Sequence, residues 1–152
     1  NRNSEEIRNL PDCISKYAGD VFVVSRNLML HGTSISHMNF DLCDSMSSPQ
    51  LARLKDSASL ARVHGCSTFA VTVWRRRLCN LSDDSYEYLD RDVLQWCRCT
   101  SIQKIKRDSV RLSRLFRAIS GGGTPWEVCA DRTWGIYKHM LWVAVRFGRN
   151  SS

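Results

Sequence analysis

The segment Thr124-Pro125-Trp126-Glu127 limits what this chain can fold into more than any other, because it combines three signals for the start of a helix. The Thr124 hydroxyl can accept a hydrogen bond from the Glu127 amide, and the Glu127 carboxylate can reach back to the Thr124 amide. Pro125 stands at the first helical position, where a missing amide proton leaves no partner unsatisfied. The sequence therefore predicts that a helix begins here.

The residues after Glu127 keep the helical period. Apolar side chains recur every three or four residues as far as Val145, and Gly148 then offers a stop. These limits predict a helix of about 22 residues and roughly 33 Å. A second helix is expected from Ser101 to Ile119, and the three glycines after it predict a short turn between two antiparallel helices.

A first helix is expected after Ser4, where Pro11 interrupts it and Asp12 can cap a continuation toward Gly19. Residues 48–65 and 82–97 have the periodicity and the end signals of two more amphipathic helices. The segments Val21-Val24 and Phe69-Trp74 suit a strand or a helix equally well, and residues 32–48 have the composition of a long connection. The sequence thus predicts an all-α fold. We expect a compact bundle of about five helices in a single domain, residues 1–152, with one long connection and room for a short strand pair.

Size and composition are those of an ordinary globular domain. The chain has 152 residues, 43% of them hydrophobic and 24% charged, which suffices for one core and is too apolar for a disordered protein. No apolar run approaches the roughly 18 residues of a membrane span. The first residues lack the apolar stretch of a signal peptide, so an exported protein is expected to have lost its signal already.

Neither catalysis nor metal binding is predicted. The four histidines stand in unrelated contexts, without a nucleophile elbow or the spacing of a metalloprotease. The cysteines lack the paired knuckles of a zinc site. The triple glycine Gly121-Gly122-Gly123 precedes a helix, but it lacks the Lys-Ser/Thr of a phosphate-binding loop and is interpreted as a flexible turn. We therefore expect a protein that is not an enzyme and holds neither a metal nor a cofactor.

The basic residues are the better functional candidates. A net charge of +7 and a pI near 9.3 favour acidic partners, which include an acidic protein surface, an anionic glycan and nucleic acid. Two basic sets are predicted to bind a partner, although a solvated helix face explains the first set equally well. The first set follows the 101–119 helix at spacings of three and four, and the second is a run: Lys104, Arg107, Arg111, Arg114 and Arg117; Arg75, Arg76 and Arg77.

Seven cysteines bear on the cellular compartment. They suit disulfides in a secreted protein or free buried thiols in a reducing one, and the disulfide candidates are Cys13, Cys97, Cys99 and Cys129. Two glycosylation sequons start at Asn80 and Asn150. Together these features favour a secreted glycoprotein with disulfides, with a cytoplasmic protein as the alternative.

The carboxyl-terminal third resembles the type I interferon-like helical cytokines. In that family a basic amphipathic helix leads through a short loop into an Ala-Trp-Glu helix start, and here Leu112 to Ile119 leads through the glycine turn into Trp126-Glu127-Val128. A leucine-rich helix that ends in a cysteine precedes these elements in the family, as Leu89 to Cys97 does here. The resemblance implies a secreted ligand of a cell-surface receptor, and it implies that Cys13 could pair with Cys97.

Two alternatives stay open. The segment from Gly122 to Trp126 is similar to the Gly-Gly-Trp of the Bcl-2 family, which implies an intracellular bundle that binds an amphipathic helix in a groove. A basic helical protein that binds nucleic acid is the third possibility.

Overall fold

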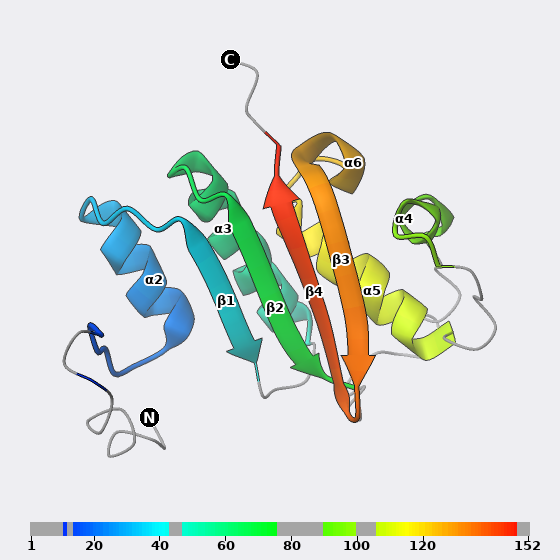
Figure 1. Ribbon diagram of the computed structural model, residues 1–152, viewed down its shortest axis with the longest axis horizontal. Helices are drawn as coiled ribbons and strands as arrows, with labels where there is room; N and C mark the ends of the chain where they lie inside the picture. The colour runs from blue at the N-terminus through cyan, green and yellow to red at the C-terminus, as the bar shows by residue number, and fades with distance from the viewer. Residues whose placement is uncertain (1–10, 12–13, 43–46, 76–89, 100–105, 149–152) are drawn as a thin grey trace.

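The computed structural model describes residues 11, 14–42, 47–75, 90–99 and 106–148 (Figure 1). Within these ranges the helices are α2 (Val21–Leu30), α3 (Ser48–Val63), α4 (Arg91–Trp96), α5 (Lys106–Ile119) and α6 (Pro125–Val128). The strands are β1 (His37–Leu42), β2 (Thr68–Trp74), β3 (Cys129–Tyr137) and β4 (Met140–Phe147). None of the described helices is long and apolar enough to cross a membrane.

The all-α prediction is wrong, because the chain contains a four-stranded mixed sheet in the order β1-β2-β4-β3. Strands β1 and β2 are parallel, and β4 runs antiparallel to both β2 and β3. Helix α3 joins β1 to β2, as a parallel pair requires a long crossover connection. Helices lie against one face of this sheet (Figure 1), so the chain is a two-layer α/β structure.

The predicted carboxyl-terminal helix is the largest error. A helix does begin at Pro125, but α6 lasts only four residues, and the chain then forms the β3–β4 hairpin. The Thr124 hydroxyl donates to the Glu127 carboxylate at 2.5 Å and makes no hydrogen bond to an amide. In β4 every second residue is buried, from Leu141 to Phe147, which is the period of a strand.

Several local predictions are confirmed. The helix expected after Ser47 is α3, and the Ser47 hydroxyl accepts from the Gln50 amide at 3.3 Å. The 101–119 helix is α5 over its described part. The helix expected over residues 82–97 is confirmed only as α4, since Asp90, expected inside that helix, is instead the non-helical cap that accepts from the Val93 amide at 3.2 Å.

The segments that suited a strand or a helix equally well fold differently from one another. Val21 to Val24 opens α2, where the Asp20 carboxylate accepts from two amides, and Phe69 to Trp74 lies in β2. The connection predicted over residues 32–48 contains β1. Residues 14–19, expected to continue a first helix, are not helical.

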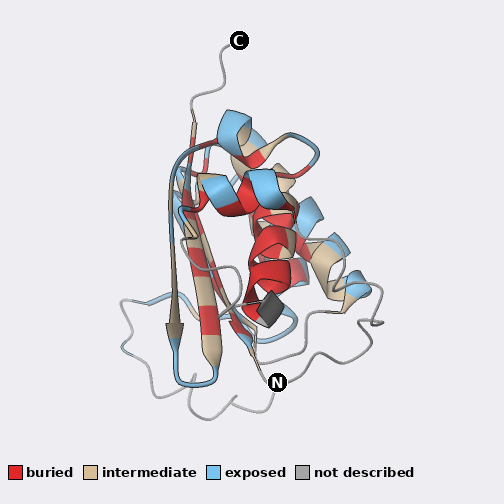
Figure 2. Cartoon of the chain, turned by 90° about the vertical axis from the view of Figure 1, so that its right-hand side faces the viewer, coloured by how far each residue is buried: buried red, intermediate tan, exposed pale blue. Residues whose placement is uncertain are grey.

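The core lies between one face of the sheet and helices α3 and α5 (Figure 2). Alternate side chains of the two central strands meet one stripe from each helix, and removal of this apolar surface from water is the main stabilising term. The central buried residues are Phe69, Val71, Val73, Leu141, Val143 and Val145 from the strands, Leu54, Ala58 and Ala61 from α3, and Leu112, Leu115, Phe116 and Ile119 from α5.

Candidate binding surface: the open face of the sheet

The second face of the sheet carries no helix among the described residues, because α2 to α5 all lie on the other side (Figure 2). Side chains alternate along a strand, so the residues between the buried ones point to this open face. They are His37, Asn39 and Asp41 of β1, Thr68, Ala70, Thr72 and Trp74 of β2, Met140, Trp142, Ala144 and Arg146 of β4, and Asp131, Thr133, Gly135 and Tyr137 of β3.

Strand register brings four large side chains together on this face. Met140 pairs with Trp74 on one neighbouring strand and with Tyr137 on the other, so these three residues form one row. Trp142 belongs to the next row of β4. We call this set, Trp74, Tyr137, Met140 and Trp142, the aromatic platform. Trp74 is 38% exposed and Tyr137 is 65% exposed, so two large aromatic side chains remain accessible on this face.

Gly135 determines how Trp142 lies. The two residues are directly opposite in the register of β3 and β4. A Cβ atom at Gly135 would lie 2.6 Å from Cζ2 of Trp142, 2.7 Å from its Cε2 and 2.8 Å from its Nε1. The indole therefore covers the glycine and extends across β3, a position that any side chain at 135 would obstruct. The β3 backbone at Gly135 thus supports one side of the Trp142 ring.

The hairpin tip beside the platform is anchored by Arg75, one of the predicted partner-binding residues. Its amide donates to the His139 carbonyl at 2.7 Å, and its Nη1 donates to the Lys138 carbonyl at 2.9 Å. Lys138 has a positive φ of 53° in this tight turn, and its Nζ lies 5.3 Å from the centre of the Tyr137 ring. A cation thus borders the platform at the turn.

Arg75 and Arg111 share one buried carboxylate, that of Asp108. The carboxylate accepts from Arg75 Nη2 at 2.7 Å and from Arg111 Nη1 at 2.8 Å, and Arg111 also donates to the Arg75 carbonyl. Burial raises the pKa of Asp108, but the hydrogen bonds and charges of both arginines outweigh it and lower the pKa below its usual value of 3.8. This network fixes the end of β2 to α5.

The basic stripe predicted along α5 is therefore not one exposed face. Arg111 is only 4% exposed, because α5 is covered by α3, α4 and the sheet. Arg117 pairs with Asp90 at 2.5 Å and lies 5.5 Å from the Trp126 ring centre, whereas Arg114 is half-buried and lines a cavity. Lys104, Arg76 and Arg77, and the side chain of Arg107, lie outside the described residues.

The prediction of disulfides is wrong for the cysteines that the structure describes. Cys66, Cys97, Cys99 and Cys129 all carry free thiols. Burial, reinforced by the nearby Cys99, raises the pKa of Cys97 to about 12, and burial raises that of Cys129 to about 11. Protonated, buried thiols of this kind are poor nucleophiles. Cys13 and the sequon asparagines Asn80 and Asn150 lie outside the described residues.

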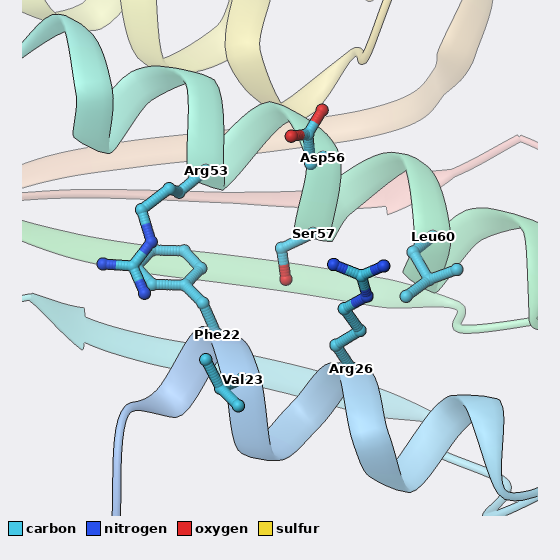
Figure 3. A pocket seen from close by; sticks show the side chains of 7 residues that line it. All are labelled: Phe22, Val23, Arg26, Arg53, Asp56, Ser57 and Leu60. Atoms are coloured by element: carbon cyan, nitrogen blue, oxygen red, sulfur yellow. The ribbon is translucent and has the colours of Figure 1, made fainter.

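A shallow pocket between α2 and α3 is built mainly for packing (Figure 3). The Arg53 guanidinium lies over the Phe22 ring, 4.5 Å from its centre, and pairs with Asp20 at 2.6 Å. Arg26 and the buried Ser57 lie along the gap between the helices. Because its principal cation is already occupied by two partners, this pocket is a weaker binding candidate than the open face.

The platform was not predicted from the sequence, because the helical period assigned Trp142 and its neighbours to a helix. The period-two alternation of apolar residues from Leu141 to Phe147 was the signal that could have shown a strand.

Among the described residues, no group of three or more His, Cys, Asp or Glu side chains is placed to hold a metal ion. No family model matches the chain, and no curated protein or solved structure shows significant similarity to it.

Proposed function

We propose that this protein binds single-stranded nucleic acid on the open face of its sheet, with bases stacked on the aromatic platform. The observation that carries the proposal is the position of Trp142 over Gly135 on a sheet face that no described helix covers, beside the exposed Tyr137 and Trp74. Nucleic acid was already one of the partners that the basic composition favoured. The cytokine-like and Bcl-2-like interpretations both depended on a helical bundle, which the mixed sheet replaces.

Flat aromatic side chains on an open sheet suit unpaired bases. Every base has a π-face, so stacking tolerates sequence variation, and each stacked base contributes about 1–3 kcal/mol. Bases in a duplex are already stacked on one another and are not available to such a surface, which favours single strands. The platform spans three adjacent strands, and neighbouring strands are about 4.8 Å apart, so it has room for more than one base.

Charge supports the same partner. Lys138 at the hairpin tip and Arg146 near the other end of β4 are both exposed and flank the platform along the strand direction. Cations in these positions can follow the phosphates of a strand whose bases lie between them. The net charge of +7 adds a general attraction for polyanions.

Fluorescence anisotropy with a labelled pyrimidine oligonucleotide tests the proposal. Trp142→Ala and Tyr137→Ala should each weaken binding roughly tenfold or more, because each removes a stacking surface. Trp126→Ala is the matched control, since Trp126 is 41% exposed but lies in α6 and outside the platform. The proposal is wrong if the wild-type protein does not bind single strands, or if the control variant loses as much affinity as the platform variants.

A further inference from the structure

A cavity on the helical side of the molecule lies between α3 and α5, far from the open face. It has a volume of about 510 Å³, and the triple glycine turn forms part of its lining. Cavities of this size hold small organic ligands. Three helix residues of α3 (Leu51, Ala52 and Lys55) line one wall, and α5 supplies Ser113, Arg114, Arg117 and Ala118 to the other.

The lining is cationic. Lys55, Arg114 and Arg117 contribute three positive charges, and the carboxylate of Asp90 contributes one negative charge, so the lining residues carry a net +2. Asp90 is occupied by Arg117, with 2.5 Å between its Oδ2 and Arg117 Nε. Lys55 and Arg114 form no ion pair with the described residues. Two cations are therefore left to face a ligand, and a phosphate dianion has the charge that would balance them.

Ser113 points independently to a ligand. It is 3% exposed, and its buried hydroxyl has no hydrogen-bond partner among the described residues. Buried polar atoms are nearly always satisfied, so an unpartnered hydroxyl in a cavity wall requires an explanation. The hydroxyl oxygen itself is closed to solvent, so the Ser113 side chain would have to turn toward the cavity for a phosphate oxygen to accept its proton and provide the missing partner.

The glycine turn contributes backbone and no side chains to the cavity lining. Gly121 has a φ of +70°, a conformation that favours glycine, and a Cβ atom there would overlap the Ser59 hydroxyl of α3 unless that side chain turned away. Gly122 is exposed and has open space where a Cβ atom would stand. The turn predicted to be a flexible connection is thus a wall of the cavity.

We propose that this cavity binds the phosphate group of a small molecule, with Lys55 and Arg114 as the charged contacts and Ser113 as the neutral donor. The apolar part of the lining, Leu51, Ala52 and Ala118, would contact the organic portion of the ligand. The site lies on the opposite layer from the aromatic platform, so it does not depend on nucleic-acid binding at the open face.

Calorimetric titration of the full chain with inorganic phosphate, with a nucleoside monophosphate and with the unphosphorylated nucleoside tests the proposal. We expect both phosphates to bind and the nucleoside not to bind. The double variant Lys55→Met/Arg114→Met should weaken binding roughly tenfold or more, because charge-assisted hydrogen bonds are lost. Ser113→Ala should weaken it by a smaller factor. A 5′-phosphorylated oligonucleotide, compared with its unphosphorylated form, shows whether the phosphate can come from a nucleic-acid end.

The controls come from the pocket of Figure 3. Arg26→Gln removes a cation, and Ser57→Ala removes another buried hydroxyl that has no hydrogen-bond partner in the described part of the chain, yet neither residue lines the α3–α5 cavity. Both controls should bind phosphate as the wild type does. The proposal is overturned if neither phosphate binds at millimolar concentration, or if these controls lose as much affinity as the cavity variants. Thermal melting of each variant separates loss of binding from loss of folding.

Discussion

At the scale of single residues, two positions control how the aromatic platform is held. Asp108 fixes Arg75 and Arg111, and Arg75 in turn holds the hairpin tip through two hydrogen bonds. Gly135 leaves the space that the Trp142 ring occupies. The sequence indicated that the two arginines matter but assigned them to a partner, because a buried carboxylate that neutralises them is visible only after the chain is folded.

Asp108→Asn should destabilise the protein by roughly 3 kcal/mol, because it leaves Arg111 buried beside a neutral group. The lowered pKa of Asp108 makes the free energy of unfolding depend on pH. Its contribution to the free energy of unfolding is fully present above the unfolded pKa near 3.8 and is lost as pH falls through the lower folded pKa. Urea denaturation between pH 7 and pH 2 tests both points. An equal acid-induced loss in the variant and the wild type would contradict this role.

Gly135→Val should displace the Trp142 ring without removing it. The near-UV circular dichroism of the indole should change, and affinity for a single strand should fall about as much as in Trp142→Ala, roughly tenfold. Gly122→Ala is the matched control, because its Cβ atom would meet open space and its φ is not positive. Retention of full affinity by Gly135→Val would show that the position of the indole is unimportant.

At the scale of elements, local signals predicted where helices begin better than how long they last. The predicted cap at Ser47 does start α3, and such a cap needs only residues within one turn. The cap that Asp20 provides for α2 was not predicted. The start at Pro125 is equally local, but the structure after α6 is decided by β2, which pairs with β4 along its full length. Strand pairing between distant segments overrides local helical periodicity, and that pairing cannot be read from the hairpin sequence alone.

Substitution at Val143 distinguishes strand from helix in this segment. In the helix predicted from the sequence, Leu141 and Ala144 would face the core and Val143 would not, whereas in β4 Val143 is fully buried and Ala144 is on the open face. Val143→Asp should therefore prevent stable folding. Ala144→Thr should change the free energy of unfolding by no more than about 0.5 kcal/mol. Thermal melting followed by circular dichroism measures both, and tolerance of aspartate at 143 would contradict the strand.

At the scale of the whole molecule, the two layers separate two kinds of chemistry. The sheet layer offers aromatic surface and few charges, and the helix layer offers a cationic cavity. The sequence shows that the protein is basic. It could not predict how aromatic and charged residues divide between the two layers, because the sheet face left without a described helix depends on where all the helices pack.

The salt dependence of binding should reflect this division. A single strand held mainly by stacking releases few counterions, and each phosphate contact adds about 0.7 to the slope of log affinity against log salt concentration. Lys138→Gln and Arg146→Gln should each reduce that slope by about 0.7. Arg26→Gln, a distant exposed cation on α2, should leave it unchanged. Equal reductions in all three variants would indicate attraction by net charge only.

Photo-cross-linking tests the central claim most directly. The full chain is irradiated with a 4-thiouridine oligonucleotide that has no terminal phosphate, and the modified peptides are identified by mass spectrometry. We predict cross-links in the β3–β4 hairpin, centred on Tyr137 and Trp142, and at Trp74 of β2. Cross-links confined to α3 and α5, with the platform peptides unmodified, would contradict the claim that nucleic acid binds the open face.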